Sequence, residues 1–463
     1  MELRGKRVTV FGLARSGVGA ANLLAEMGAK VTVTDKKSEG ELSEIMKKLA
    51  PSVRSSLGGH RDEVWVSADL LVVSPGVPME VEPVAAAKEM GIPVIGELEL
   101  AYRILENRIP FLAVTGSNGK STTTTLLNYI LIKSGFKTVL GGNIGNALTE
   151  EILKMGNGQI GPDFCVVEVS SFQLESIDTF RPFISAILNI TPDHMDRYRG
   201  MSDYAVAKAR IFENQDEGDF LVLNADDPET MRIENEKMKG KKGKPDIFHF
   251  SRLREVKGVY YRNGTVYCNM PSIDPLPFPL IEASGIKIKG VHNLENAMAA
   301  SAMALLADCS PGAVIESLRE FSGLEHRLEF VREMNGVKYV NDSKGTNIGA
   351  VVKSLESFQE PLILIAGGRD KAGDFSVLRD LVSEKVKALV LIGEAAEKIR
   401  EALGNVTDTI IAKDLRNAVE ICGQRAEKGD TVLLSPACAS FDMFRDFEDR
   451  GRQFKKIVME IGK

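Results

Sequence analysis

The stretch FLAVTGSNGKS, residues 111–121, decides how the rest of the chain is interpreted. Its first four residues, Phe111–Val114, are all apolar and predict a buried strand, and a helix is predicted from Ser121 to about residue 134. A glycine loop between a strand and a helix lets backbone N–H groups surround phosphate oxygens, and the helix N-terminus adds partial positive charge. The stretch therefore predicts an α/β domain with a phosphate site.

The loop is a shortened variant of the common phosphate-loop pattern G-x-x-x-x-G-K-[ST], because Val114 stands where the first glycine is expected. Lys120 is placed to reach β- and γ-phosphates, and Ser121 offers a hydroxyl to Mg²⁺. ATP or GTP is the expected ligand, and a plain strand-to-helix turn is the alternative.

A second apolar run, Phe164–Val167, ends at Glu168 and is followed by polar residues. An acidic residue at the end of a neighbouring strand commonly helps to hold the Mg²⁺ of a bound nucleotide. Glu168 fits that role, while a carboxylate that merely ends a strand is the alternative.

Further strand-like runs flank the glycine loop on both sides. They stand at 6–11, 30–34, 68–73, 186–190, 338–341, 361–366, 388–392 and 431–434. Short apolar runs that alternate with helices predict parallel sheets, and Asn263-Gly264 predicts a hairpin turn. We expect an α/β protein of three domains: a Rossmann-like domain at 1–98, a central P-loop ATPase-type parallel sheet with a small β element at 99–323, and a second Rossmann-like domain at 324–463.

The first strand runs into a second glycine turn, GLARSG at 12–17. It resembles G-x-G-x-x-G with Ala14 in place of the second glycine, and Asp35 ends the next strand, near the spacing of a ribose-binding acid. Taken alone, the turn would suggest a dinucleotide-dependent dehydrogenase. The same geometry also suits the diphosphate of a nucleotide sugar, and both interpretations remain open at this point.

Composition excludes some classes of protein. The 58 basic and 64 acidic residues give a formal net charge of -6, so no electrostatic footprint for nucleic acid is present. The five cysteines are scattered without CxxC spacing, which favours reduced thiols over disulfides or zinc. No apolar run is long enough to span a bilayer, and no signal segment is apparent, so we expect a cytoplasmic protein without membrane insertion.

Ordered blocks along almost the whole chain resemble the Mur ligase and folylpolyglutamate synthase superfamily. They are TGSNGKS (115–121), EVSSFQL (168–174), NITPDHMD (189–196), VHNLENA (291–297), EHRLE (325–329) and NDSKGTN (341–347). A last block, LSPACASFD (434–442), looks like the branch that adds D-glutamate. The nucleotide-sugar-like N-terminal region is unlike the folylpolyglutamate synthases.

The resemblance implies an ATP-dependent amide-bond ligase of peptidoglycan precursor synthesis. Its implied substrates are UDP-N-acetylmuramoyl-L-alanine and D-glutamate, its implied cofactors are ATP and two Mg²⁺ ions, and a monomer is expected. The implied reaction passes through an acyl phosphate and a tetrahedral intermediate. The rival hypotheses are a relative that takes another amino acid, a non-catalytic nucleotide-binding protein and a dehydrogenase.

The resemblance also assigns residues by position. The catalytic set is Lys120, Asn143, Glu168, His194 and Lys208. The ATP set is Gly116, Ser117, Asn118, Gly119, Lys120, Ser121, Thr122, Asn296, Arg327 and Asp342. The UDP-sugar set is Ser16, Asp35, Lys36, Ser74 and Asn143. The D-glutamate set is Lys344, Thr346, Lys371, Ser440 and Phe447, and the metal set is Ser121, Glu168, His194 and Lys208.

Two of these assignments carry a structural expectation of their own. A lysine ammonium cannot ligate Mg²⁺, so the resemblance implies that Lys208 is carbamylated, which supplies the hard oxygen that Mg²⁺ prefers. The alternative is an ordinary solvated surface lysine. Ser440 is expected at a helix start, where backbone N–H groups would hold a carboxylate.

Overall fold

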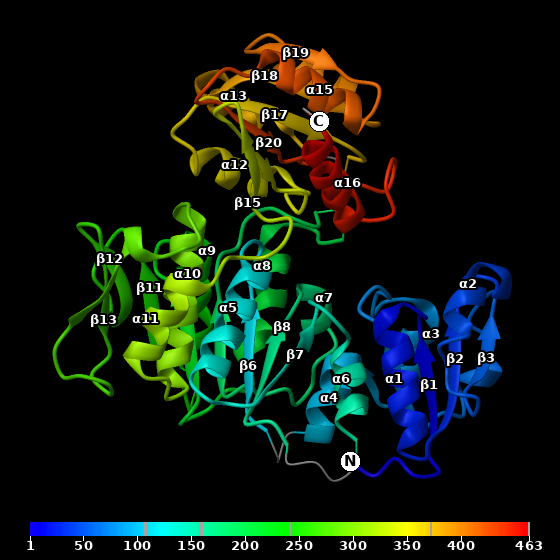
Figure 1. Cartoon of the computed structure of the whole chain (residues 1–463). Coiled ribbons are helices and arrows are strands. Elements are labelled where there is room, and N and C mark those ends of the chain that lie inside the picture. Colours follow the sequence, from blue (N-terminus) through cyan, green and yellow to red (C-terminus); the bar gives the residue numbers. More distant parts are fainter. Residues whose placement is uncertain (106–108, 157–160, 196, 241, 371–372, 462–463) are drawn as a thin grey trace. The chain divides into compact units, whose positions relative to one another are not determined.

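The computed structural model describes residues 1–105, 109–156, 161–195, 197–240, 242–370 and 373–461 (Figure 1). The contacts within the chain divide it into two compact units. The first comprises Met1–Ile190, His194–Gly285 and Glu295–Arg319, and the second comprises Thr191–Asp193, Ile286–Leu294 and Glu320–Lys463.

The first unit begins with a five-stranded parallel sheet in the order β3-β2-β1-β4-β5. The chain reverses its direction of progress beside β1, so the carboxyl ends of β1 and β4 flank a topological switch point, where ligands bind in Rossmann-type folds. This confirms the Rossmann-like prediction for the N-terminal region. The strands and helices are β1(Arg7–Phe11), α1(Arg15–Glu26), β2(Lys30–Asp35), α2(Glu39–Met46), β3(Arg54–Leu57), β4(Leu70–Val73), α3(Glu82–Glu89) and β5(Val94–Gly96).

The second sheet of this unit has nine strands in the order β14-β13-β12-β11-β10-β9-β6-β8-β7. The strands from β7 to β12 pair in parallel, and β12, β13 and β14 form an antiparallel meander that is the predicted small β element. The hairpin prediction is confirmed, because Asn263 and Gly264 both have positive φ, at 49° and 86°. The strands are β6(Phe111–Thr115), β7(Thr138–Gly142), β8(Phe164–Glu168), β9(Ile184–Ile187), β10(Phe220–Asn224), β11(Asp246–Ser251), β12(Gly258–Arg262), β13(Thr265–Asn269) and β14(Phe278–Glu282).

The helices around this sheet bury an aromatic core. Tyr102, Phe111 and Phe180 pack edge to face with ring centres 5.3–5.8 Å apart. Helix α9 continues to Met238 and buries that side chain. The helices are α4(Glu97–Leu105), α5(Lys120–Lys133), α6(Leu148–Met155), α7(Ser171–Leu174), α8(Met201–Ala209) and α9(Pro228–Met238), while α10(Val291–Leu306) and α11(Pro311–Glu320) have residues in both units.

The second unit holds a six-stranded sheet in the order β15-β16-β20-β17-β18-β19, parallel except for the edge strand β15. One apolar cluster packs α12, α13 and α14 on one side of the sheet, and another packs α15 and α16 on the other. This doubly wound arrangement confirms the Rossmann-like prediction for the C-terminal region. The elements are β15(Glu329–Met334), β16(Val337–Asn341), α12(Ile348–Glu356), β17(Leu362–Gly367), α13(Arg379–Lys385), β18(Val386–Ile392), α14(Ala396–Leu403), β19(Asp408–Ile411), α15(Leu415–Arg425), β20(Thr431–Leu434) and α16(Phe447–Glu460).

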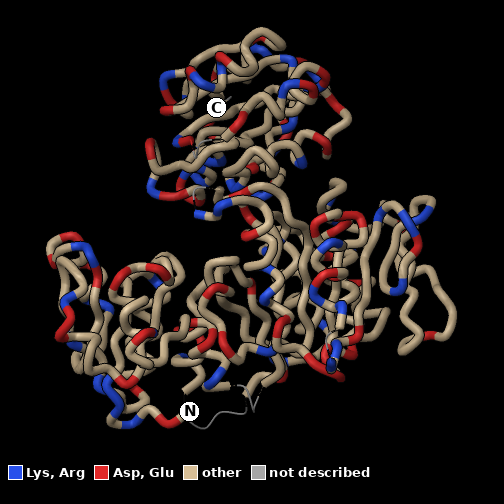
Figure 2. The backbone as a smooth tube through the Cα atoms, turned by 180° about the vertical axis from the view of Figure 1, so that it is seen from behind, with Lys and Arg blue, Asp and Glu red and all other residues tan. Residues whose placement is uncertain are grey.

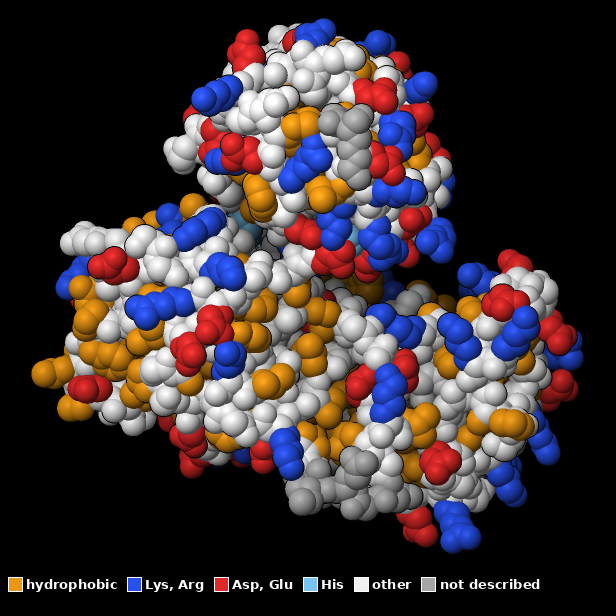
Figure 3. Space-filling model, in the orientation of Figure 1, with side chains coloured by type: hydrophobic (Ala, Val, Ile, Leu, Met, Phe, Trp, Pro, Cys, Tyr) orange, Lys and Arg blue, Asp and Glu red, His pale blue; other side chains and the backbone are white. Residues whose placement is uncertain are grey.

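The charged side chains are mixed in sign over the chain. Figure 2 shows Lys and Arg interspersed with Asp and Glu along the backbone, and the face in Figure 3 shows the same mixture. Among the residues that the structure describes, no helix combines the length and the apolar character needed to cross a membrane.

Candidate active site

The loop Gly116–Gly119, called here the central loop, joins β6 to α5. Gly116 and Gly119 have φ of 154° and 85°, which L side chains rarely adopt. A Cβ atom on Gly119 would also lie 2.2 Å from Asn296 Oδ1. The glycines therefore allow this backbone to curl tightly beside Asn296, as the sequence predicts for a phosphate-binding loop.

Two lysine amines converge on one carbonyl of the central loop. Lys120 Nζ donates to the carbonyl oxygens of Gly116 and Ser117 at 2.8 and 2.9 Å, and Lys208 Nζ donates to Gly116 at 2.8 Å. Lys208 is only 1% exposed, and its Nζ lies 4.5 Å from the ring centre of Tyr204. The alternative of a solvated surface lysine is therefore wrong for Lys208.

A carboxylate lies at the end of the neighbouring strand. Glu168 ends β8 opposite Val114, and its Oε1 accepts a hydrogen bond from Asn143 Nδ2 at 2.7 Å. Its Oε2 is buried and has no hydrogen-bond partner. A buried carboxylate oxygen without a partner is costly and is the ligand chemistry that Mg²⁺ prefers, so this donor fits a metal ion. Ser121, the other predicted ligand beside it, is buried in the first turn of α5.

The segment that follows β9 is joined to the central loop by hydrogen bonds of Asn189. Asn189 accepts from Ser117 N with its carbonyl and from Asn118 N with its Oδ1, at 2.9 and 2.8 Å. Its Nδ2 returns a hydrogen bond to Asn118 O at 3.1 Å. The predicted site residues did not include Asn189, although it lies inside the block NITPDHMD.

His194 follows on the same segment with a positive φ of 57°. Its ring packs edge-on against Phe172 at 4.7 Å and lies 6.5 Å from Tyr204. Ser117 Oγ donates to Tyr204 Oη at 3.2 Å, so Tyr204 contacts the central loop as well as Lys208. Tyr204 was also missed, and its signal is the spacing of four residues that puts it beside Lys208 on α8.

The first unit thus brings most of the predicted ATP and metal residues to the carboxyl ends of β6, β8 and β9. Asn296 joins them, because its Oδ1 accepts from Thr123 Oγ1 at 3.2 Å. The residues so connected are Gly116, Ser117, Asn118, Gly119, Lys120, Asn143, Glu168, Lys208 and Asn296, with Ser121 and Thr122 in the first turn of α5 and His194 against Tyr204.

The N-terminal loop, Gly12–Ala14, has different supports. Asp35 accepts hydrogen bonds from Leu13 N at 2.7 Å and from Lys37 N at 2.9 Å, and Ser74 Oγ donates to Gly12 O at 2.8 Å. Both carboxylate oxygens of Asp35 therefore accept hydrogen bonds from backbone N–H groups of the chain itself. The structure brings the predicted residues Asp35 and Ser74 to this loop.

The remaining two predicted residues of this set border the same loop. Ser16 is half-buried in the first turn of α1, and Lys36 is exposed beside Asp35. Both follow the carboxyl ends of strands that pair in the sheet, β1 and β2.

In the second unit, the loop Asp342–Asn347, called here the third loop, joins β16 to α12. Asp342 Oδ2 accepts from the hydroxyls of Ser435 and Ser354 at 2.6 and 2.7 Å. Burial raises the pKa of Asp342 to about 6, although these hydrogen bonds and the charge of Arg327 act in the opposite direction. Asp342 is thus a buried acid that holds its proton more firmly than an ordinary aspartate.

The predicted D-glutamate residues of the second unit come together in part. Lys344 Nζ lies 3.7 Å from the ring centre of Phe447, a cation–π contact. Thr346 N donates to Lys344 O at 2.8 Å, so both lie on the loop after Asp342. Lys371 lies outside the described residues.

Ser440 is not at a helix start, so that prediction is wrong. Its carbonyl accepts from Met443 N and Phe444 N at 3.2 and 2.9 Å, which makes a turn. Helix α16 begins only at Phe447, because Asp446 accepts from Asp449 N and caps the helix there.

Arg450 fastens the Ser440 segment to the third loop. The side chain is fully buried and donates to the carbonyl oxygens of Ser343 at 2.8 Å and Cys438 at 3.3 Å. Burial lowers the pKa of the guanidinium to about 10. The arginine therefore holds two predicted binding segments in one place.

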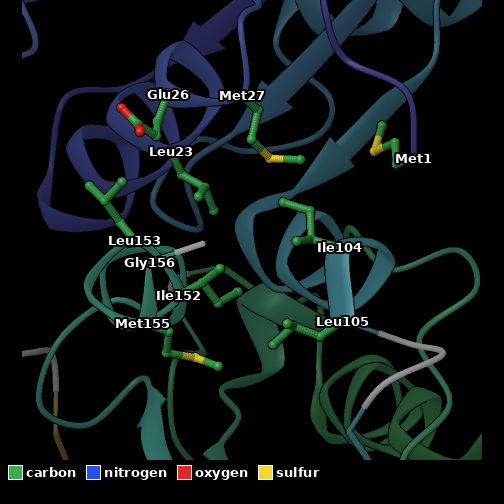
Figure 4. A pocket seen from close by; sticks show the side chains of 10 residues that line it. All are labelled: Met1, Leu23, Glu26, Met27, Ile104, Leu105, Ile152, Leu153, Met155 and Gly156. Carbon is green, nitrogen blue, oxygen red and sulfur yellow. The ribbon is translucent and has the colours of Figure 1, made fainter. Parts of the chain in front are cut away.

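A cavity of about 300 Å³ lies elsewhere in the first unit, at the C-terminal ends of α1, α4 and α6 (Figure 4). Its lining is aliphatic and thioether, with Glu26 as the charged member among Met1, Leu23, Glu26, Met27, Ile104, Leu105, Ile152, Leu153, Met155 and Gly156. None of the predicted site residues lines it, so it is separate from the candidate active site.

Family models match three consecutive parts of the chain. The Mur ligase MurD-like N-terminal domain matches residues 6–96, the Mur ligase middle domain matches 114–304, and the Mur ligase glutamate ligase domain matches 326–438. A UDP-N-acetylmuramoylalanine--D-glutamate ligase of Geotalea uraniireducens is 47% identical over 100% of this chain and 99% of its own length. The ligase of that name from Caldanaerobacter subterraneus is 43% identical over all of both chains.

Solved structures share the fold at lower identity. The MurF ligase of Thermotoga maritima in complex with ADP aligns with a TM-score of 0.61 and 17% identity over 99% of this chain and 96% of that one. A pseudomurein peptide ligase type C from Methanothermus fervidus aligns with a TM-score of 0.60 and 19% identity over 99% and 100%. With relatives above 40% identity over its whole length, the chain belongs to the Mur ligase family.

Proposed function

We propose that this chain is an ATP-dependent ligase that adds D-glutamate to UDP-N-acetylmuramoyl-L-alanine, giving ADP and phosphate, in cytoplasmic peptidoglycan precursor synthesis. Two observations together carry the proposal. The amines of Lys120 and Lys208 both donate to the Gly116 carbonyl, and the buried carboxylate of Glu168 has one oxygen without a hydrogen-bond partner. The printed name of relatives that are 43–47% identical supports the choice of amino acid and acceptor.

The reaction must activate a carboxylate, because a carboxylate does not condense with an amine in water. In the proposed first step a carboxylate oxygen of the UDP-sugar attacks the γ-phosphorus of ATP, and the bond to ADP breaks. The D-glutamate amine then attacks the acyl phosphate and a tetrahedral intermediate forms. The intermediate loses phosphate, which takes up the proton that the amine gives up. Lys120 and the N–H groups of the central loop would neutralise the triphosphate and hold it in line.

We assign the metal sites from the donor set. Ser121 and Glu168 would hold one Mg²⁺, and His194 with carbamylated Lys208 would hold a second. Bound Mg²⁺ would supply electrostatic stabilisation of the transferred phosphoryl group. The burial of Lys208 beside the central loop supports the carbamate, because a carbamate there would place hard oxygen ligands at the proposed metal site.

The other assignments follow the same proposal. Residues 1–98 would bind the UDP-sugar through Ser16, Asp35, Lys36 and Ser74, with Asn143 from the central domain, residues 99–323. ATP would also contact Arg327 and Asp342, and residues 324–463 would bind D-glutamate through Lys344, Thr346, Lys371, Ser440 and Phe447. The proposed active form is a monomer.

The test is phosphate release by the purified chain with ATP, Mg²⁺ and UDP-N-acetylmuramoyl-L-alanine, across amino acids of both hands. The proposal expects release that requires both the UDP-sugar and D-glutamate. Release with a different amino acid would refute the specificity and retain a ligase. Absence of release with every combination would refute the proposed activity.

A further inference from the structure

Helix α4 begins with two buried carboxylates, Glu97 and Glu99, that differ in how many of their oxygens accept hydrogen bonds. Glu97 is 1% exposed and Glu99 is 0% exposed. Both oxygens of Glu99 are paired: Oε1 accepts from Arg103 Nε and Thr179 Oγ1, each at 2.6 Å, and Oε2 accepts from Asp178 N and Phe180 N, each at 2.9 Å. These hydrogen bonds lower the pKa of Glu99 in spite of its burial.

Glu97 has partners on one oxygen only. Its Oε1 accepts from both the backbone N and the hydroxyl of Thr149, each at 2.8 Å, while Oε2 is buried and accepts no hydrogen bond. Burial raises the pKa of Glu97, against these hydrogen bonds and the charge of Arg15. A buried carboxyl with an unpaired oxygen is rare in folded proteins and calls for an explanation.

Thr149 is the point where three parts of the first unit meet. It lies in the first turn of α6, and Glu97 reaches it from the start of α4. From a third direction, α1 packs so closely that a Cβ atom on Gly19 would lie 2.7 Å from Thr149 Oγ1 and 3.3 Å from Glu150 N. Only glycine fits there, so this contact fixes α1 against α6 without slack.

Two of these helices, α1 and α6, carry a predicted binding segment at the same end. The first turn of α1 contains Ser16 and follows the N-terminal loop. The segment before α6 contains Asn143, whose side chain donates to Glu168. The Glu97–Thr149–Gly19 contact therefore joins the predicted UDP-sugar loop to the predicted reacting centre.

The far ends of the same helices border a cavity. Leu23 of α1, Met27 just after α1, Ile104 of α4 and Ile152 of α6 line this cavity of about 300 Å³ (Figure 4). Apolar side chains around a cavity can shift against one another at little cost. The close approach of Gly19 to Thr149 lies at the opposite end, beside Glu97.

We propose that Glu97 is a positioning residue for the ligation: through Thr149 it sets the spacing between the N-terminal loop, which holds the UDP-sugar, and Asn143 beside Glu168. This inference rests on the proposed function. Glu99 performs no such task, because its partners all lie on α4 itself and on residues 178–180.

The experiment compares Glu97→Ala and Glu97→Gln with Glu99→Gln as the matched control. Glu97→Ala removes the oxygen that accepts from both the N–H and the hydroxyl of Thr149. We expect KM for the UDP-sugar to rise and kcat to fall at least tenfold each, with KM for ATP within twofold of wild type. Glu97→Gln keeps a carbonyl oxygen for Thr149 and should stay within threefold of wild type in every constant. Glu99→Gln should lower the melting temperature without changing the ratio of KM for the UDP-sugar to KM for ATP.

Wild-type kinetics in Glu97→Ala would overturn the proposal, as would equal effects on the two KM values. Hydrogen exchange gives a readout that does not depend on activity. Glu97→Ala should speed exchange in 12–17 and 143–149 and leave 116–122 unchanged, and uniform or absent changes would overturn the proposal. If the wild type ligates nothing, the proposed function fails, and exchange still decides whether Glu97 couples these segments.

Discussion

The central loop and the N-terminal loop use one backbone device with different side chains. Each joins a strand with parallel neighbours to the start of a helix. The central loop turns on Gly116 and Gly119 and the N-terminal loop on Gly12, all with positive φ. The central loop receives the amines of Lys120 and Lys208 on a single carbonyl, whereas the N-terminal loop is supported by the carboxylate of Asp35 and the hydroxyl of Ser74. The difference teaches that a similar strand–loop–helix backbone can be supported by side chains of opposite charge, amines at the central loop and a carboxylate at the N-terminal loop.

The largest effect is expected when the Lys120 amine, which donates to the central loop, is removed. We expect Lys120→Ala to lower kcat by roughly 1,000-fold, the scale of losing a preorganised donor to developing charge, without changing the affinity for UDP. Steady-state kinetics and calorimetry with UDP measure the two effects. Lys133→Ala, at the exposed end of the same helix, is the control. A variant at position 120 that keeps a tenth of the activity would contradict the assignment.

Asp342, the buried acid of the third loop, allows a second test, because its protonation makes the stability of the fold depend on pH. Asp342 has a pKa of about 6 in the folded chain, above the ordinary value of 3.8, so the folded state keeps a proton that the unfolded state has lost between these pH values. Stability therefore falls as pH rises from about 4 to 6, by on the order of 3 kcal/mol.

Asp342→Asn should remove this slope. Denaturant unfolding of the wild type and the variant, followed from pH 4 to 7, measures it. The variant should gain on the wild type as pH rises, and parallel pH profiles would show that Asp342 does not hold its proton in the folded chain.

A pair of glycine substitutions separates the two loops. A Cβ on Gly119 would lie 2.2 Å from Asn296 Oδ1, and one on Gly17 would lie 1.9 Å from Gly12 O. Strain of this kind costs roughly 1–3 kcal/mol, or about 5- to 150-fold in affinity. Gly119→Ala should weaken a non-hydrolysable ATP analogue and spare UDP, and Gly17→Ala should do the reverse. Equal loss of both ligands in either variant would mean that the loops do not act separately.

The smallest effect is expected at Asp35. Asp35→Ala leaves the backbone N–H groups of Leu13 and Lys37 without their carboxylate, which costs about 1 kcal/mol and raises KM for the UDP-sugar several-fold. Lys37→Ala retains the backbone N–H and serves as the control. An unchanged KM in Asp35→Ala would show that the N-terminal loop keeps its shape without the carboxylate.

The local elements around the central loop could be predicted from the sequence. Phe111–Val114 is wholly apolar, and the glycines mark the turn, so strand, loop and helix were placed within a residue of β6 and α5. The Asn263-Gly264 hairpin was equally local, and the structure confirms it.

Partners far apart in the chain could not be predicted in the same way. The hydrogen bonds from Asn118 N to Asn189 Oδ1 and from Ser117 Oγ to Tyr204 Oη span 71 and 87 residues. The Ala-rich surroundings of Lys208 look like any helix, so its burial appears only when α8 packs against the central loop. The Ser440 helix start was wrong because Asp446, six residues later, is the residue that caps the helix.

The five cysteines have a practical consequence. All are buried and free, and burial raises the pKa of every one of their thiols. Since the thiolate is the reactive form, the native chain should resist alkylation. One cysteine placed at exposed Lys237 and another at exposed Glu401 would then take spectroscopic labels without removal of the natural thiols. Distances between the two units can thus be followed in solution while each substrate is added in turn.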